Sequence, residues 1–155
     1  MKKNYIDFYN NLIKLSTNKD LYKDFTRQDT FSDRLVLMLI HFAFVLKNFK
    51  NDKNTKILQE IYDFNFRQLE LSIREIGYGD QSINKKMKDY INLFHSMVSE
   101  LHFWDKSTKT EKINKLSNFL LDFNNIEYLF DYFENFNIKL SKISLNSYLK
   151  SVSNH

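Results

Sequence analysis

Apolar side chains recur at spacings of three and four residues along most of the chain, which is the period of an amphipathic α-helix. The chain contains no proline and only two glycines, so it has few residues that interrupt a helix. The pattern therefore predicts an all-α protein of about six to eight helices with no sheet. Because no internal repeat, flexible linker or low-complexity segment divides the sequence, residues 1–155 are expected to form a single domain.

Start and stop signals set the limits of the predicted helices. Ser32 or Asp33 is expected to cap the third helix, after a loop. Thr108 followed by Glu111 is a capping box that begins the sixth helix. The predicted helical segments are residues 5–15, 21–25, 33–49, 55–76, 82–101, 109–124, 126–136 and part of 140–155.

The longest apolar run, Leu35 to Leu46, predicts a buried core helix, because a membrane span needs about 20 apolar residues and this run is shorter. In the next helix, Phe64 and Leu71 widen the apolar face, which indicates neighbours on more than one side. The third, fourth and fifth helices are therefore expected to form the centre of the fold. Residues expected to be buried are Leu39, Phe42, Leu46, Ile61, Leu69, Ile73, Ile91 and Phe94.

The composition excludes some classes of chemistry and leaves others open. The chain has no cysteine, so it has neither disulfides nor a cysteine-based metal site or nucleophile. A net charge of +4 and an isoelectric point near 9.1 are mildly basic. This balance permits contact with RNA, the ribosome or anionic lipid without requiring it, and no specific DNA binding is expected.

The N-terminus does not resemble a targeting segment. Lys2 and Lys3 precede Asp7, which interrupts any apolar core of a signal peptide, and the segment lacks the Arg- and Ser-rich composition of a mitochondrial presequence. A bacterial, cytoplasmic location is therefore favoured, with peripheral contact at the inner face of the inner membrane as a further option.

Both glycines lie in one short segment, Gly77-Tyr78-Gly79-Asp80. A left-handed residue commonly ends a helix and is usually glycine, so Gly77 is expected to terminate the fourth helix with a positive φ. Asp80 or Ser82 is then expected to cap the fifth helix. The segment is not a dinucleotide-binding loop, because a helix precedes it and no third glycine follows. A structural corner between two helices is one complete explanation.

A second interpretation treats the same corner as a surface for a protein partner. Arg74, Glu75, Tyr78 and Lys85 place charges of both signs and an aromatic ring around it, and Arg and Tyr are enriched in binding hot spots. Glu70 and Arg74 also have the spacing of an intrahelical ion pair, so a purely structural role for Arg74 remains open. The candidate partner-binding residues are Arg74, Glu75, Gly77, Tyr78, Gly79, Asp80 and Lys85.

Arg34 and His41 share one face of the third helix and form a candidate structural or functional polar pair. A histidine on an apolar helix is typically a core residue with one hydrogen bond. A metal site is not expected, because Val45 rather than a ligand stands one turn after His41. No catalytic constellation is evident, and neither an enzymatic activity nor a cofactor is expected.

The segment IREIGYGDQSINKKMKDYINLF, from Ile73 to Phe94, resembles the signature of the ubiquinol–cytochrome c chaperone family. A second segment, DTFSDRLVLMLIHFAFVLKNFK, resembles the family's Arg-led apolar helix. The family often has Phe-Tyr-Gly-Arg where this chain has Phe-His-Ser-Met, which leaves the role of that Gly-Arg pair without an equivalent here. Ile73 stands where the family usually has Leu. Positions that fall on the family pattern are Arg34, His41, Glu70, Ile73, Arg74, Glu75, Gly77, Gly79, Asp80 and Lys85.

The resemblance implies a chaperone for cytochrome b and for assembly of the cytochrome bc1 complex, respiratory complex III. It also implies an apolar client, nascent or unassembled cytochrome b, together with the ribosome and a small partner protein. An apolar client calls for an accessible groove, and the aromatic C-terminal third around Tyr128, Tyr132 and Phe136 is a candidate for it. The alternative is a helical RNA- or ribosome-binding module, based on Lys85, Lys86, Lys88, Lys139, Lys142 and Lys150.

Overall fold

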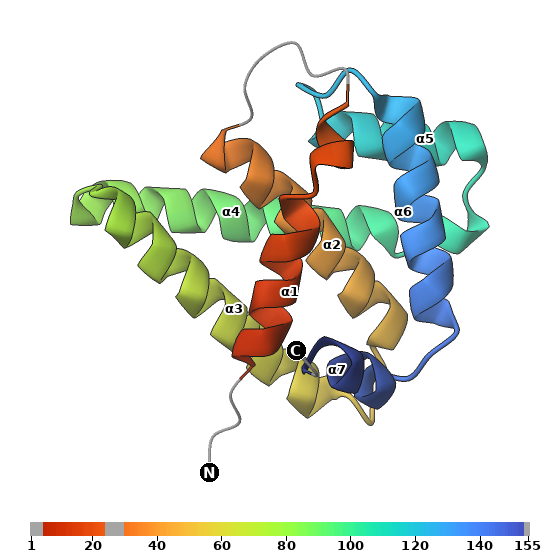
Figure 1. Ribbon diagram of the computed structural model, residues 1–155, viewed down its shortest axis with the longest axis horizontal. Helices are drawn as coiled ribbons and strands as arrows, with labels where there is room; N and C mark the ends of the chain where they lie inside the picture. The colour runs from red at the N-terminus through yellow and green to blue at the C-terminus, as the bar shows by residue number, and fades with distance from the viewer. Residues whose placement is uncertain (1–4, 24–29, 154–155) are drawn as a thin grey trace.

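The computed structural model describes residues 5–23 and 30–153, and all regular structure within these ranges is helical (Figure 1). This confirms the predicted all-α class. A 3-10 turn at Lys19–Tyr22 replaces the predicted second helix, of which residues 24 and 25 lie outside the described ranges. The α-helices are α1 Ile6–Ser16, α2 Phe31–Phe49, α3 Thr55–Ile76, α4 Asp80–Leu101, α5 Lys109–Phe119, α6 Ile126–Ser141 and α7 Leu145–Ser153.

Helix α2 lies at the centre of the fold and packs against α1, α4 and α6 (Figure 1). Each residue from Leu37 to Val45 is buried, because other helices cover this helix on several sides. The prediction of a buried core helix is therefore confirmed. Within the described ranges, no helix is long and apolar enough to cross a membrane.

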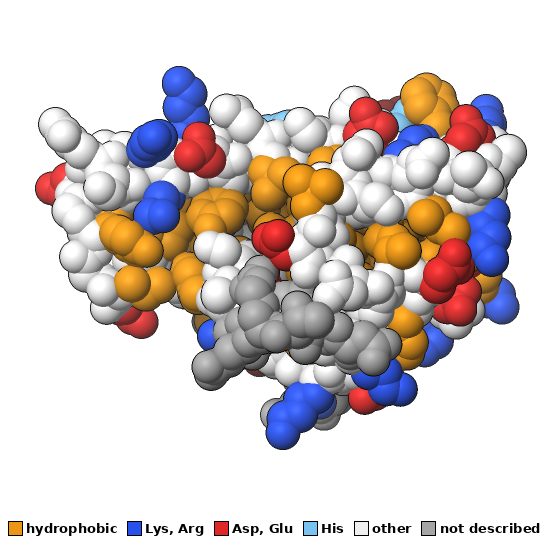
Figure 2. Space-filling view, turned by 90° about the horizontal axis from the view of Figure 1, so that it is seen from above, with side chains coloured by type: hydrophobic (Ala, Val, Ile, Leu, Met, Phe, Trp, Pro, Cys, Tyr) orange, Lys and Arg blue, Asp and Glu red, His pale blue; other side chains and the backbone are white. Residues whose placement is uncertain are grey.

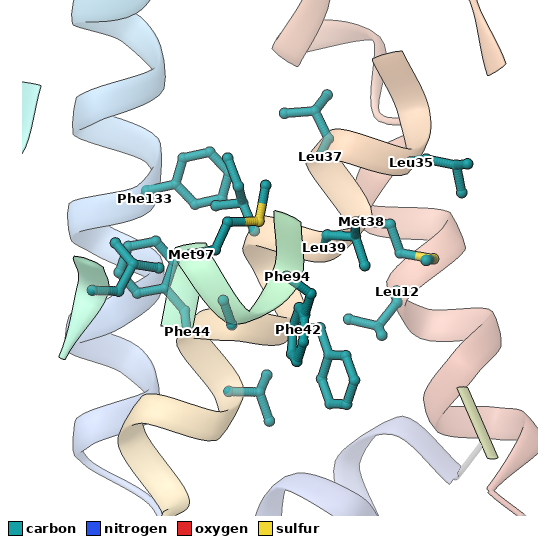
Figure 3. Close-up of a cluster of buried hydrophobic side chains, with 14 of the residues drawn as sticks. Leu12, Leu35, Leu37, Met38, Leu39, Phe42, Phe44, Phe94, Met97 and Phe133 are labelled. Carbon is teal, nitrogen blue, oxygen red and sulfur yellow. The ribbon is translucent and has the colours of Figure 1, made fainter. Parts of the chain in front are cut away.

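The core around α2 contains two pairs of stacked aromatic rings. Phe42 stacks on Phe94 of α4 with ring centroids 4.9 Å apart, and Phe44 stacks on Phe133 of α6 at 5.5 Å. Figure 3 shows these pairs on two sides of α2, with Leu12 of α1 on the side of Met38. The core therefore joins segments from both ends of the sequence.

The predicted central position of α3 is wrong. Helix α3 packs chiefly against α4, and the two project together from the rest of the molecule (Figure 1). Leu71, which widened the apolar face, is 44% exposed, and Phe64 is half-buried against the edge of the Tyr5 ring. Helix α3 nevertheless has neighbours on more than one side, as predicted. Phe66 packs beside Phe42 of α2 with ring centroids 6.5 Å apart, and the Tyr9 hydroxyl of α1 lies 3.4 Å from the Ser72 hydroxyl.

Six of the eight residues expected to be buried are buried, and Leu46 and Ile91 are only half-buried. Leu46 falls short of full burial because it lines an open groove of about 350 Å³ beside α3 and α4. Ile91 lies between the buried and solvated faces of α4. Helical spacing alone does not distinguish such edge positions from the centre of a buried face.

Two capping boxes fix the ends of helices. The predicted box of Thr108 and Glu111 is present, with N–H···O distances of 3.2 and 2.8 Å. Helix α2 begins with a second box, in which Thr30 is the N-cap and Asp33 is the third helical residue. The expectation that Ser32 or Asp33 caps this helix is therefore wrong, because the Asp33 carboxylate reaches back to the N–H of Thr30 at 2.9 Å. Helix α5 ends at Phe119, earlier than predicted.

Candidate partner-binding site

The corner between α3 and α4 forms as the sequence predicts at Gly77. Gly77 ends α3 with φ 100° and ψ 18°, and its N–H donates to the carbonyl oxygen of Arg74 at 3.0 Å. A Cβ atom at this position would meet no other atom within 4 Å. Gly77 is therefore required for its left-handed backbone conformation, and not for close approach of another segment.

The predicted cap of α4 is wrong. Gly79 is the N-cap, with an extended backbone at φ −71° and ψ 160°, and no side chain accepts a capping hydrogen bond there. Asp80 is the first helical residue and Ser82 lies within the first turn. The Asp80 carboxylate accepts a hydrogen bond from Arg74 instead, while its negative charge still favours the positive end of the helix dipole.

Arg74 bridges the two helices of the corner. Its Nη1 atom lies 3.1 Å from Oδ1 of Asp80, and its Nε atom lies 3.9 Å from Oε2 of Glu70. The Arg74 side chain is 44% exposed, so these surface ion pairs contribute only about 0–1 kcal/mol to stability. Arg74 thus acts as a support between α3 and α4, and its exposed part is still accessible to a partner.

The other candidate residues lie on the surface of the corner. Glu75, Tyr78 and Lys85 are exposed, and they lie on either side of the α3–α4 turn at the projecting end of the molecule. The Nζ atom of Lys86 lies 4.6 Å from the centre of the Tyr78 ring, a cation–π contact. Sequence reasoning assigned Lys86 to the RNA-binding alternative and not to this surface, because only the fold of the corner brings its ammonium over the tyrosine ring.

Apolar groups add to this surface. Ile76 is 50% exposed and Tyr78 is 42% exposed, so both present apolar surface to solvent. Figure 2 shows apolar side chains at the surface of this end of the molecule, with charged groups of both signs beside them. Such a mixture of aromatic, aliphatic and charged groups is typical of a protein contact surface.

Arg34 and His41 are not brought together. Arg34 is exposed in the first turn of α2, and its Nε atom donates to the carbonyl oxygen of Thr30 at 3.4 Å. His41 is completely buried, and its Nδ1 and Nε2 atoms lie 2.6 Å from the Leu37 carbonyl oxygen and the Tyr132 hydroxyl. His41 is thus a core histidine, as expected, with two hydrogen bonds where one was anticipated.

The surroundings of His41 determine its protonation. A carbonyl oxygen only accepts hydrogen bonds, so Nδ1 carries the proton and Nε2 accepts from Tyr132. Burial lowers the pKa of His41 from 6.5 to about 4, because the protonated ring loses its hydration. Among the residues that the structure describes, no three His, Cys, Asp or Glu side chains gather as a metal site would require.

The aromatic C-terminal third lines a groove, as the sequence suggested. Tyr128, Tyr132 and Phe136 of α6 face a groove of about 640 Å³ whose walls come from α1 and α7. Sequence reasoning missed these walls, which include Asn11 and Tyr148, because they lie more than a hundred residues apart in the chain. A hydrogen bond of 3.0 Å from the Tyr148 hydroxyl to Oδ1 of Asn11 joins them.

These features define an all-α protein whose candidate sites are surfaces and grooves suited to binding another polypeptide. Comparison with known families agrees with this class. The sequence model of the ubiquinol-cytochrome C chaperone family matches residues 23–112, which include α2, α3, α4 and the corner, and the chain belongs to this family. The predicted resemblance is thus confirmed.

A solved structure has the same fold. The crystal structure of the Cbp3 homolog from Brucella abortus superposes with a TM-score of 0.73 and 24% sequence identity. The match covers 94% of this chain and 84% of that chain, so it includes α1 and the helices after α5 as well. A search of curated protein sequences gives no significant match.

Proposed function

We propose that this protein is a non-enzymatic chaperone that holds unassembled cytochrome b during assembly of the cytochrome bc1 complex, respiratory complex III. The observation that carries the proposal is the family match over residues 23–112, which includes the central helix and the Gly77–Gly79 corner. The shared fold with the Cbp3 homolog from Brucella abortus is consistent with it.

The chemistry of the client explains what such a protein does. A membrane helix that has not yet been inserted exposes apolar surface, and each Å² favours aggregation by about 25 cal/mol. A holding protein covers that surface and so raises the yield of assembled complex without taking part in a reaction. This role requires neither a catalytic group nor a cofactor.

The partner surface in this proposal is the corner, with Arg74, Glu75, Tyr78 and Lys85 around Gly77 and Gly79. Its support is the exposure of these side chains around the turn that Gly77 makes and that the Arg74–Asp80 ion pair spans. Arg and Tyr are among the side chains most enriched in protein-contact hot spots. The surface would contact cytochrome b, or the ribosome or a small partner protein that delivers it.

The place of action in this proposal is the cytoplasmic face of the bacterial inner membrane, where a newly made cytochrome b is inserted. The net charge of +4 favours peripheral contact with anionic lipid. The alternative of a helical RNA- or ribosome-binding module gains no support, because the lysines of α4 are interspersed with the exposed carboxylates of Asp80 and Asp89.

A deletion strain tests the proposal. Loss of the protein should lower assembled complex III on native gels and lower haem-stained cytochrome b, while the transcript of the complex III operon stays constant. Expression of the intact chain should restore both. Normal levels of complex III in the deletion strain would contradict the proposed function.

A further inference from the structure

Within the described ranges, one face of α6 is not covered by another helix and is open to a partner. Helix α6 packs against α2 and α5, and its remaining face forms the floor of the groove between α1 and α7. In Figure 1, α1 and α6 both run roughly vertically with α2 between them, and α7 lies towards their lower ends. The residues of this face are Tyr128, Asp131, Tyr132, Asn135, Phe136 and Lys139.

The length of this face suits a helical segment. From Tyr128 to Lys139 the helix rises by about 16 Å, at 1.5 Å per residue, which corresponds to about three turns. A groove between two helices that is open along this length has the shape in which an amphipathic helix is commonly bound. The groove volume of about 640 Å³ is large enough for side chains from one face of such a helix.

The lining is rich in aromatic and uncharged hydrogen-bonding groups. Tyr128, Tyr132 and Tyr148 provide rigid contact area, and Asn11 and Asn135 provide adaptable donors and acceptors. Tyr and Asn have the same roles in antibody binding loops, where they supply large contacts at low entropic cost. A charged segment would lose its hydration here without gaining a partner along most of the groove, which is unfavourable.

Two polar groups in the groove are held in place before any ligand binds. Tyr132 donates its hydroxyl proton to the buried His41, so the phenol oxygen can only accept from a ligand. Oδ1 of Asn11 accepts from Tyr148, so its amide group is left to donate. Together they present one acceptor and one donor, the combination that binds the hydroxyl and carboxamide groups of an otherwise apolar segment.

The two charges in the groove stand apart along α6. Asp131 and Lys139 are separated by eight residues, or about 12 Å of helix. A helix carries partial positive charge at its N-terminus and partial negative charge at its C-terminus. The charges therefore favour a bound helix with its N-terminal end near Asp131 and its C-terminal end near Lys139, parallel to α6.

From these features we propose that the groove between α1, α6 and α7 binds an uncharged helical segment of the client, about three turns long, that carries a few hydroxyl or carboxamide side chains. This rests on the proposed chaperone function, since membrane-destined segments have this chemistry. It names a surface away from the α3–α4 corner, and its residues lie mostly outside the segment 23–112 that matches the family.

A defined peptide tests the groove directly on the full chain. The probe is an acetylated and amidated helical peptide of about 14 residues, built from Ala, Leu, Ser and Gln. Its affinity is measured by fluorescence anisotropy, and amide chemical shifts of the protein map where it binds. The same peptide with two lysines in its Leu stripe should bind at least about tenfold more weakly.

Three variants with matched chemistry locate the site. Asn135→Arg and Ser151→Arg place a bulky charge on the α6 floor and the α7 wall, at exposed positions where folding should be unaffected. Each should weaken peptide binding by at least about tenfold. Asn92→Arg makes the same change on the exposed face of α4 and should leave the affinity unchanged. Circular dichroism should show that all three variants are folded.

Several outcomes would overturn the inference. These are no binding to the native protein, equal binding by native and groove variants, or chemical-shift changes confined to α3 and α4. A spin label at the peptide N-terminus should broaden signals near Asp131 more than those near Lys139, and the reverse pattern would refute the orientation. The deletion strain separates this test from the function: if complex III requires the protein but the groove variants bind peptide normally, only the groove assignment fails.

Discussion

The Nε2 atom of His41 lies 2.6 Å from the hydroxyl oxygen of Tyr132, which is 91 residues further along the chain. This contact joins the middle of the central helix α2 to the floor of the groove on α6. The His41 ring also packs edge-on against Phe133 and Phe136, with ring centroids 5.0 and 5.1 Å away. His41 is thus a neutral core residue that also holds Tyr132 and Phe136, two residues of the groove floor, in position.

The pKa of His41 predicts a loss of stability in mild acid. Burial lowers this pKa to about 4, whereas the unfolded chain has the ordinary value of 6.5. Between these values the unfolded chain binds the proton and the folded chain does not, so the free energy of unfolding falls as the pH falls. From pH 7.5 to pH 5 this single group should lower it by about 2 kcal/mol.

Urea denaturation of the native protein and of His41→Gln at both pH values measures this contribution. Carboxylates titrate in both proteins alike, so the difference between the two pH dependences isolates the histidine. The variant should lose less stability than the native protein on acidification. Equal losses would show that His41 does not resist protonation in the folded state.

Gly77 and Gly79 should respond differently to the same substitution. Gly77→Ser places a side chain at φ 100°, which costs about 1–2 kcal/mol of stability. Gly79→Ser should cost nothing or stabilise, because Gly79 has an ordinary φ of −71° at an N-cap position, where serine is favoured. Melting temperatures compare the two. Equal effects of both substitutions would show that the left-handed backbone is not what requires Gly77.

Glu134 should be needed to hold Trp104 in the core. The Trp104 indole N–H donates to Oε1 of Glu134 at 3.1 Å, and the Lys112 ammonium lies 2.7 Å from Oε2. Glu134→Leu leaves both donors without their acceptor in a largely buried site, which should lower stability by about 2–3 kcal/mol. Emission from Trp104, the chain's single tryptophan, follows the denaturation.

Glu127→Leu is the matched control for this substitution. Glu127 is exposed on the same helix, and its carboxylate lies 3.9 Å from the Lys109 ammonium, so its loss should change stability by less than about 1 kcal/mol. If the two variants were equally stable, the buried contacts of Glu134 would not contribute as the geometry indicates.

Replacement of Arg74 and Lys85 by alanine tests the corner as a partner surface. Because the ion pairs of Arg74 are exposed, the double variant should lose at most about 1 kcal/mol and remain folded by circular dichroism. It should nevertheless support less assembled complex III in a deletion strain. Lys88→Ala, at another exposed position of α4, is the control and should assemble the complex normally.

Two results would contradict the partner role of the corner. An unfolded Arg74→Ala, Lys85→Ala variant would show that these charges are structural supports. A folded variant that assembles complex III normally would direct attention to the groove around Tyr128, Tyr132 and Phe136.

The sequence by itself determined the helical class, most helix limits and the conformation of Gly77. These depend on local physics: the period of apolar residues, capping boxes such as Thr108 with Glu111, and the small set of backbone angles open to a non-glycine residue. The family resemblance was equally accessible, because its motif lies in one continuous segment.

Only the tertiary structure decided which helix is central, what Asp80 binds and where a groove opens. Leu71 and Leu39 have the same hydrophobicity, yet one is 44% exposed and the other is buried, because burial depends on which helices pack beside them. Arg74 donates a hydrogen bond to Asp80 across the corner. Tyr148 donates one to Asn11, which lies near the other end of the chain. Such contacts depend on how whole helices pack in space, and the spacing of residues within one helix does not encode them.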